Sequence, residues 1–332
     1  MIKMTKIKAV CLFSGGLDSV IAAKLMLSEG ISVFGLKIDT PFYERCADGE
    51  NKAAVAAEKL GIPLKTIDAG PKYLRIVRNP AHGHGSAMNP CIDCRIYMLK
   101  KAWKYAKQIG AKFIITGEVV GQRPMSQRIA AMKMIEQKAH LCSRIVRPLS
   151  GKNLLKTEAE KKGWIARERL YGICGRSRKM QMQLAEKLGI GDYQPPGGGC
   201  LLTCAEFARK VRDLLRHKKR VSAGDLKMLK VARHFRFGKN KIIVGANEQD
   251  NKVLLKLKNK TDYIFEVPEI GSPVTVLTGK KTKDAIKMAA RLTLRYSDAS
   301  SGKGIVRYGK KRAVKPIYVE PAKQKEIEKL RI

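Results

Sequence analysis

The sequence has no hydrophobic run long enough to cross a bilayer, and its first ten residues lack the apolar core of a signal peptide. These two absences predict a cytoplasmic protein with no membrane partner. Negative charge is also scarce, because 29 Asp and Glu stand against 67 Lys and Arg, for a net charge of +38. Such an excess predicts a polyanionic partner, most simply a nucleic acid. Adaptation to salt or heat is the alternative, although heat adaptation usually raises Lys and Glu together.

The chain is long enough, at 332 residues, for two or three domains. Strand-like and helix-like segments alternate through its first half, which predicts a parallel sheet covered on both faces and therefore an α/β fold. We expect strands at 7–13, 31–38, 64–69 and 112–118, and helices at 18–30, 50–61 and 94–111.

The pattern changes twice further along the chain. Segments 154–170, 177–189 and 205–220 have helical patterns, and a Pro/Gly-rich loop precedes the last of them. From residue 222, short strands, among them 252–258, surround a helix at 281–297, which predicts a small α+β module. The expected domains are therefore 1–150, 151–221 and 222–332.

The turn SGGLDS, residues 14–19, has no Lys after its glycines and no Gly-x-Gly-x-x-Gly pattern, which excludes a Walker A loop and a dinucleotide fingerprint. It lies between a strand and a helix, where free N–H groups and the helix dipole favour an anion. Gly15 and Gly16 allow close backbone approach, and Ser14 and Ser19 offer hydroxyls. Asp18 suits either Mg²⁺ binding or a helix cap. From the residues alone, a tight strand–helix turn stays an alternative.

This turn resembles the signature of the PP-loop ATP pyrophosphatases, which cleave ATP between its α- and β-phosphates and adenylate a substrate oxygen. The resemblance implies a PP-loop (adenine nucleotide alpha hydrolase-like) fold, with ATP and Mg²⁺ at Ser14, Gly15, Gly16, Asp18 and Ser19. Thr116 and Gly117 end a later strand, at the sheet edge where such folds bind ligands. An ordinary strand end is the alternative for these two residues.

The cysteines lack a second Cys-x-x-Cys at the spacing of a zinc ribbon. Cys91 and Cys94 form one such pair at the start of a helix, a position suited to metal binding or redox work. Cys200 ends the Gly-rich loop, with Cys204 and Cys174 as rivals for its role. The remaining cysteines are interpreted as structural or solvent-facing: Cys11, Cys46 and Cys142. The neighbouring His82 and His84 are more readily explained as a polar loop than as ligands.

Three thiolates suit an iron–sulfur cluster with one open iron. Cys91, Cys94 and Cys200 resemble the cysteines of the cluster-dependent tRNA thiolation enzymes of the PP-loop group, which implies that they hold a [4Fe-4S] cluster. The cluster-free tRNA thiouridylases are a second template, in which Cys94 and Cys200 would be nucleophile and persulfide carrier, in either order. Structural zinc, with Cys204 as the fourth ligand, is a third.

The C-terminal segment mixes Arg and Lys with aromatics, as in nucleic-acid binding, or as in the core of a small domain. Residues 233–251 resemble the RNA-binding module of the NFACT family. Together these resemblances imply ATP-dependent thiolation of a uridine in tRNA, giving 2-thiouridine or 4-thiouridine. No rhodanese-like extension follows, which implies free sulfide or a separate carrier such as a cysteine desulfurase. The alternative outside enzymes is a non-catalytic RNA- or ribosome-binding adaptor with an ATP site. The oligomeric state is not predicted.

Overall fold

The computed structural model describes residues 6–43, 51–191, 193, 199–299 and 302–332. The chain forms two compact units, Met1–Thr203 and Cys204–Ile332, called unit 1 and unit 2 below. The division into three domains stays a prediction. Cys46 lies outside the described residues.

Unit 1 is built around a parallel sheet with the strand order β3-β2-β1-β4-β5. Its strands are β1 (Lys8–Leu12), β2 (Ser32–Asp39), β3 (Leu64–Asp68), β4 (Phe113–Ile115) and β5 (Ile145–Val146). Residues 9–11 are wholly buried because β1 is central, with β2 on one side and β4 on the other. The strand order therefore reverses between β1 and β4, and open parallel sheets bind their ligands at the carboxyl ends of strands at such a reversal.

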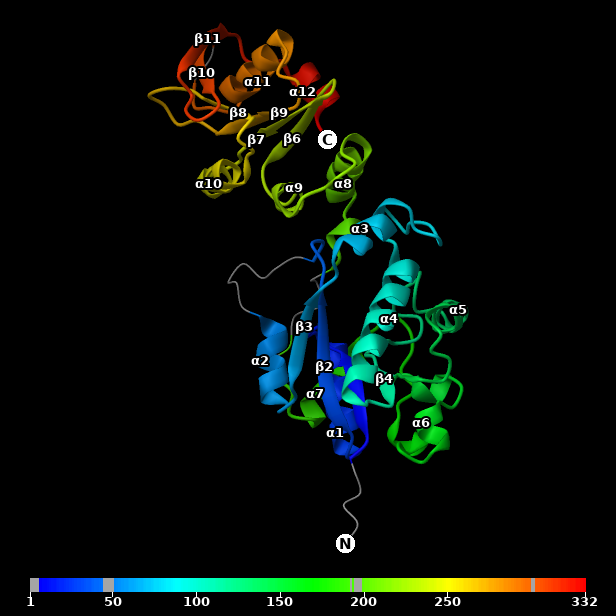
Figure 1. Cartoon of the computed structure of the whole chain (residues 1–332). Coiled ribbons are helices and arrows are strands. Elements are labelled where there is room, and N and C mark those ends of the chain that lie inside the picture. Colours follow the sequence, from blue (N-terminus) through cyan, green and yellow to red (C-terminus); the bar gives the residue numbers. More distant parts are fainter. Residues whose placement is uncertain (1–5, 44–50, 192, 194–198, 300–301) are drawn as a thin grey trace. The chain divides into compact units, whose positions relative to one another are not determined.

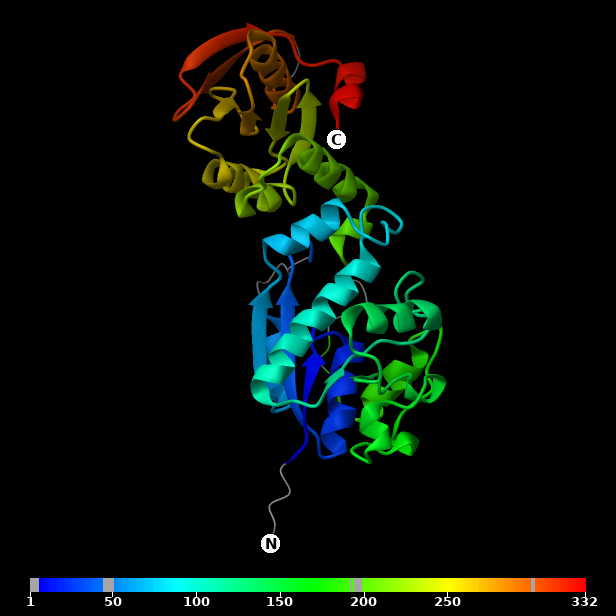
Figure 2. The ribbon, with the colours of Figure 1, turned by 45° about the vertical axis from the view of Figure 1, so that its right-hand side comes forward.

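Helices cover both faces of this sheet, so the predicted α/β class is confirmed. They are α1 (Leu17–Ser28), α2 (Lys52–Lys59), α3 (Pro71–Arg78), α4 (Cys91–Ile109), α5 (Ile129–Ala139), α6 (Glu158–Lys161) and α7 (Lys179–Lys187), with 3₁₀ turns η1 (Gly151–Asn153), η2 (Arg167–Arg169) and η3 (Leu201–Thr203). Helix α2 lies on one side of the sheet and α4 on the other (Figure 1). Helix α4 crosses in front of the sheet in the turned view (Figure 2) and contacts β1 and β4. It ends at Gly110, whose φ of 71° is a left-handed stop.

Unit 2 contains an antiparallel sheet with the order β11-β10-β8-β9-β7-β6, which confirms the expected α+β module. Its elements are α8 (Ala205–His217), α9 (Ala223–Met228), β6 (Arg233–Phe237), β7 (Asn240–Val244), α10 (Glu248–Leu257), β8 (Tyr263–Glu266), β9 (Thr275–Thr278), α11 (Lys283–Arg295), β10 (Gly304–Gly309), β11 (Lys315–Val319) and α12 (Gln324–Leu330). One core joins α11 to the sheet around Phe235 and Phe265. A second core joins α9 and α10 to the sheet through Met228 and Leu254.

Two secondary-structure predictions were wrong. Segment 252–258 belongs to helix α10, because the Asn247 side chain accepts a hydrogen bond from the Asp250 N–H at 2.8 Å and starts a helix. Leu254 is then buried while Leu255 is 44% exposed. Segment 154–170 contains only the short α6 and η2, because Gly163 adopts a φ of 68° just after α6.

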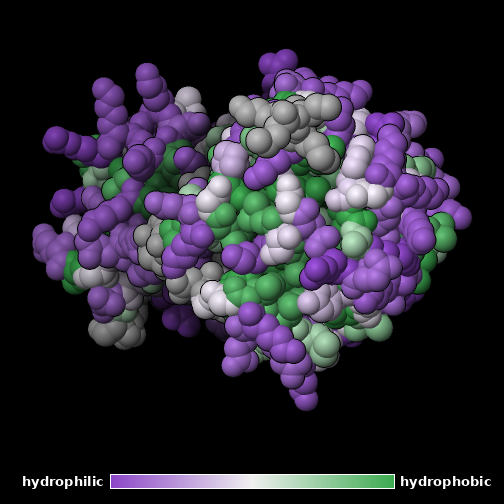
Figure 3. Space-filling view, turned by 90° about the horizontal axis from the view of Figure 1, so that it is seen from below, coloured by the Kyte–Doolittle hydropathy of each residue, from purple (hydrophilic) through white to green (hydrophobic). Residues whose placement is uncertain are grey.

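The described residues include no helix that is both long and apolar enough to span a bilayer. In the space-filling view, hydrophilic side chains surround a central hydrophobic area on the visible face (Figure 3). That face is therefore polar over most of its extent.

The cap of α10 can be tested by Asn247→Ala. Loss of the cap should destabilise α10 by about 1 kcal/mol. Because amide exchange in a helix that opens locally follows the free energy of opening, amides of α10 should then exchange roughly fivefold faster. Hydrogen-exchange mass spectrometry of a peptide covering α10 measures this. Lys252→Ala, which removes an exposed Lys252–Glu248 pair on the same helix, is the control. Equal exchange in Asn247→Ala and the unmodified protein would contradict the assigned cap.

Candidate active site

The turn between β1 and α1 is tightly packed around its glycines and serine hydroxyls. Gly15 has a φ of 78°, and a Cβ there would lie 2.7 Å from Ala53 Cα, so a larger residue does not fit. The hydroxyls of Ser14 and Ser19 lie 3.3 Å apart, and Ser19 Oγ donates to Gly16 O at 2.8 Å. Gly16 is the N-cap of α1 and makes no side-chain cap. The N–H groups of Ser19 and Val20 donate to Gly16 O, whereas those of Leu17 and Asp18 lie in the first turn of α1, where a helix offers N–H groups to an anion.

Thr116 and Gly117, directly after β4, lie against this same turn. A Cβ on Gly117 would come within 2.4 Å of the Asp18 carbonyl carbon and oxygen. Thr116 is buried, and its Oγ1 donates to Glu118 Oε2 at 3.1 Å. The structure thus brings together the two segments predicted from the sequence at the reversal between β1 and β4.

Asp18 is the carboxylate of the turn, and its pKa is shifted from the usual value. Burial raises the pKa of Asp18, and a hydrogen bond from Gln122 and the charges of Arg178 and Arg123 partly oppose this rise. Gln122 Nε2 donates to Asp18 Oδ2 at 3.2 Å. Asp18 Oδ1 is buried and makes no hydrogen bond in the described part of the chain, although the nearby Gln181 side chain also lowers the pKa of Asp18. An orphaned carboxylate oxygen beside an anion site fits a divalent cation such as Mg²⁺.

The sequence analysis did not foresee a buried ionic network next to Thr116. Glu118 is 2% exposed and lies 2.8 Å from Arg95 Nε and 3.0 Å from Arg147 Nε. Burial opposes the ionisation of Glu118, but the charges of Arg95 and Arg147 outweigh it and lower the pKa. Arg147 also bonds Glu136 on α5. Because Arg95 is on α4, this network connects the end of β4 to the helix that begins at Cys91.

The Cys-x-x-Cys lies in the first turn of α4. Tyr73 Oη lies 3.1 Å from Cys94 Sγ, and Asn89 Nδ2 donates to Cys91 Sγ at 3.1 Å. Burial raises the pKa of Cys94, while the hydrogen bond from Tyr73 and the charge of Arg95 oppose that rise. Both thiols therefore have protein hydrogen-bond partners at the start of α4.

Cys200 is held by backbone contacts with residues 42 and 43. It forms an isolated antiparallel bridge with Tyr43, and Leu201 N donates to Phe42 O at 2.8 Å. Burial raises the pKa of Cys200 to about 12, and the nearby Cys94 and Cys91 add to this rise. A hydrogen bond from the Leu202 backbone partly lowers the pKa. The three predicted cysteines are thus close enough to influence one another's ionisation.

The described side chains include no group of three or more His, Cys, Asp or Glu residues that could hold a metal ion. A [4Fe-4S] cluster has several irons, and its thiolates attach to different corners. Cys91, Cys94 and Cys200 supply thiols, which are the ligands that such a cluster requires.

Each of the other candidate ligands is exposed or makes another contact. Cys174 is exposed and bridges to Val120, and Cys204 is exposed in unit 2. The His82 ring lies 2.9 Å from Asp93 Oδ1, and His84 Nε2 lies 2.9 Å from Val77 O. These contacts support the interpretation of both histidines as part of a polar loop.

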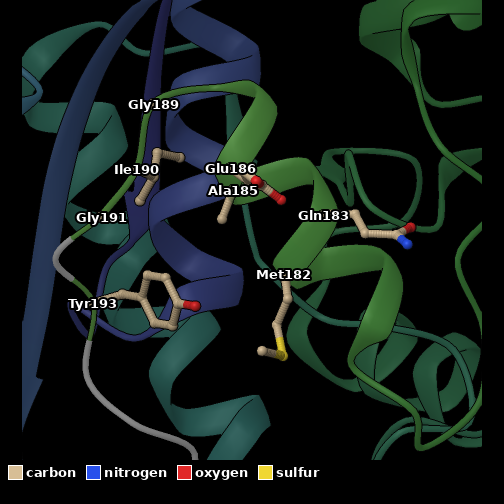
Figure 4. Close-up of a pocket in the computed structure, with 8 residues that line it drawn as sticks. All are labelled: Met182, Gln183, Ala185, Glu186, Gly189, Ile190, Gly191 and Tyr193. Carbon is tan, nitrogen blue, oxygen red and sulfur yellow. The ribbon is translucent and has the colours of Figure 1, made fainter.

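Two hollows occur near these elements. An open depression of about 330 Å³ is lined by Gln122, Arg123, Arg176, Arg178, Gly199, Cys200 and Thr203. A larger groove of about 610 Å³ is lined by residues of α7 and by Gly189, Ile190, Gly191 and Tyr193 (Figure 4). The first hollow contains Cys200 and the Asp18 partner Gln122, so it belongs to the candidate site.

Unit 2 presents an exposed aromatic side chain among cations. Tyr318, 65% exposed, pairs across the sheet with Ile305, 49% exposed, and Arg307 is exposed next to them. Val306 and Val319 point to the α11 core instead. Lys310, Lys311 and Arg312 are exposed at the turn between β10 and β11. An aromatic ring flanked by cations suits base stacking and phosphate contacts in RNA.

Comparison with known proteins agrees with both predicted resemblances. Residues 4–162 match the family described as thiamine biosynthesis protein (ThiI), and residues 232–331 match the NFACT protein RNA binding domain. The PP-loop and NFACT resemblances are therefore confirmed for these two parts of the chain.

Curated relatives match part of this chain. A probable tRNA sulfurtransferase of Thermococcus kodakarensis is 33% identical over 156 residues, 44% of this chain and 38% of that protein. The tRNA-specific 2-thiouridylase MnmA of Syntrophotalea carbinolica is 33% identical over 113 residues, 31% of this chain and 32% of that protein. The chain thus spans about a third of the length of these curated relatives.

A solved structure, the U34-tRNA thiolase NcsA from Methanococcus maripaludis with its [4Fe-4S] cluster, aligns at a TM-score of 0.37 and 19% identity. The alignment covers 68% of this chain and 70% of that one. A likeness at this level carries no argument about function.

Gly117→Ala tests the contact between β4 and the turn. The new Cβ would overlap the Asp18 backbone, so the turn must shift, and we expect ATP binding to weaken by roughly tenfold or more. Titration calorimetry measures the affinity. Gly224→Ala is the control, because its Cβ meets only Ser222 Oγ, at 3.7 Å. Unchanged ATP affinity in folded Gly117→Ala would refute this geometry.

Tyr73→Phe tests the environment of Cys94. Its hydroxyl lowers the pKa of Cys94, so its removal should raise that pKa and slow alkylation of Cys94 at any fixed pH near 8. Mass spectrometry of the Cys94 peptide after timed iodoacetamide treatment gives the rate. Tyr97→Phe is the matched control, because Tyr97 bonds Ala69 O instead. Faster or unchanged alkylation in Tyr73→Phe alone would count against the hydrogen bond.

Proposed function

We propose that this protein is an ATP-dependent tRNA sulfurtransferase that replaces a uridine carbonyl oxygen with sulfur. The carrying observation is the assembly of Cys91, Cys94 and Cys200 beside a depression that also contains Gln122, the partner of Asp18. The ThiI match, the relatives named sulfurtransferase and thiouridylase, and the NFACT RNA-binding match support the same function.

The nucleotide site proposed for unit 1 is the turn after β1. The N–H groups of α1, with Gly15, Gly16, Ser14 and Ser19, would hold the phosphates of ATP. Asp18 would bind Mg²⁺ through its orphaned Oδ1. Thr116 and Gly117 would form the opposite wall, held in place by Glu118.

The first chemical step proposed is adenylation. The uridine carbonyl oxygen attacks the α-phosphorus of ATP, an O–P bond forms, and pyrophosphate leaves. Sulfur then attacks the activated ring carbon, and AMP departs with the former carbonyl oxygen. Adenylation thus converts a poor leaving group into a good one before the soft nucleophile arrives.

The sulfur site proposed is the set of Cys91, Cys94 and Cys200. A [4Fe-4S] cluster held by these three thiols would supply an open iron able to bind sulfide. The chain's own contribution is to bury the thiols and to orient Cys94 and Cys91 through Tyr73 and Asn89.

The cluster-free alternative uses the same residues. A separate carrier such as a cysteine desulfurase would transfer sulfane sulfur to one of Cys94 and Cys200 and form a persulfide. The persulfide would attack the activated carbon as AMP leaves, and the other thiol would then cleave the resulting disulfide and release thiolated tRNA. That route leaves a Cys94–Cys200 disulfide, which an external thiol must reduce. Structural zinc is the remaining alternative for these thiols.

The partners proposed follow from the same scheme. Unit 2 would hold tRNA, and the sulfur would come from sulfide or from a separate carrier such as a cysteine desulfurase. These reactants are cytoplasmic, which supports the expected location.

Metal analysis and a thiolation assay test this proposal together. Protein purified without oxygen should contain iron and acid-labile sulfide, and should convert uridine in bulk tRNA to thiouridine with ATP, Mg²⁺ and sulfide. Cys91→Ala and Cys200→Ala should lose both iron and activity, whereas the exposed Cys142→Ala should keep both.

Each other outcome has a defined meaning. Iron-free protein that is inactive with sulfide, but thiolates tRNA when a cysteine desulfurase and cysteine replace it and then contains a Cys94–Cys200 disulfide, supports the persulfide route over the cluster. Zinc without thiolation supports the structural-metal interpretation. ATP and RNA binding without pyrophosphate release or thiolation would refute the enzyme and favour an RNA-binding adaptor.

A further inference from the structure

The depression beside Cys200 is lined by three arginines from two segments. Arg123 follows β4, while Arg176 and Arg178 precede α7. The segments are fastened together, because Gly175 N donates to Val120 O at 2.8 Å and Val120 bridges to Cys174. The arginines are therefore presented by a backbone pairing and not by two unconnected loops.

These three arginines differ from Arg95 and Arg147, the other arginines near the site, in forming no ion pair with a described carboxylate. Arg95 and Arg147 are paired with carboxylates at 2.8 and 3.0 Å. Arg123, Arg176 and Arg178 form no ion pair with any described carboxylate. The acid they influence is Asp18, whose pKa Arg178 and Arg123 lower, and Asp18 already bonds Gln122. Three cations around one hollow repel one another, so this arrangement favours a bound anion.

The position of the hollow indicates which anion it fits. It extends from Gln122, the Asp18 partner, to Cys200, so a base undergoing adenylation and sulfur transfer would lie here. Arg123 and Arg176 are exposed and Arg178 is half-buried, as suits the backbone of a strand entering from solvent. The phosphates of ATP have separate donors in the N–H groups of α1 and the hydroxyls of Ser14 and Ser19.

We propose that Arg123, Arg176 and Arg178 form a phosphodiester-binding site that holds the RNA backbone next to the target uridine. This inference rests on the proposed function, because it requires the RNA to enter the Cys200 depression. It assigns to unit 1 an RNA contact separate from the RNA-binding match of unit 2. Arginine suits this role because its planar fork binds two phosphate oxygens at once.

Single substitutions in the full chain test the site. Arg176→Ala and Arg123→Ala should each weaken tRNA binding about fivefold near physiological salt and reduce the slope of log affinity against log salt by about 1. Each should also raise KM for tRNA and leave KM for ATP unchanged. Arg176→Lys should restore the salt slope because it keeps the charge. Filter binding without ATP gives the affinities.

The matched control is Arg169→Ala, which removes one charge from the same unit. Arg169 lies near Glu29, at the other end of α1 from Asp18, roughly 16 Å along that helix. It should leave tRNA affinity, its salt slope and both KM values unchanged.

The outcomes separate this site from the proposed function. Weaker tRNA binding in the Arg123 and Arg176 variants alone, even if no variant thiolates RNA, supports the phosphodiester site and counts against the reaction. Normal tRNA binding with a raised KM for ATP would overturn it in favour of a nucleotide-phosphate site. An equal loss of tRNA affinity in Arg169→Ala would also overturn the site, because it would show that any removed positive charge weakens binding.

Discussion

The buried carboxylate of Glu118 holds the candidate site together. It lies 2.8 Å from Arg95 on α4 and 3.0 Å from Arg147, and it accepts the hydroxyl of Thr116. Removing one partner of a buried ion pair typically costs about 3–5 kcal/mol, because the remaining charge is left unpaired. The same carboxylate therefore holds the end of β4, which lies against Asp18. It also holds helix α4, which begins at Cys91 and includes Cys94. Both chemical halves of the site depend on this one group.

The sheet explains why these halves meet. The order of strands reverses between β1 and β4, so the turn after β1 and the loop after β4 open at the same edge. Gly117 lies against the Asp18 backbone at a distance that no side chain allows. The loop then continues to Gln122 and Arg123, which reach the Asp18 carboxylate on one side and the Cys200 depression on the other.

Local patterns predicted the parts of the site that follow directly from chain order. The turn at residues 14–19, the strand end at Thr116 and the Cys91–Cys94 pair all have short signatures, and the structure brings the first two together. The Glu118 network and Tyr73 have no such signature, because their partners are distant in the chain. Segment 252–258 was mispredicted because its apolar run fits a strand, and the deciding signal was the Asn247 cap before it.

Several of the few acidic side chains of this chain form ion pairs that are buried or half-buried. Glu118 and Glu136 pair with buried or half-buried arginines in unit 1, and Asp213 and Glu326 do the same in unit 2. These acids serve the fold, so the excess of Lys and Arg stays largely unneutralised at the surface. A net charge of +38 attracts any polyanion over a distance set by salt. Discrimination must then come from local geometry, and the arginine-lined depression beside Cys200 is a place where cations, a thiol and the Asp18 partner Gln122 converge.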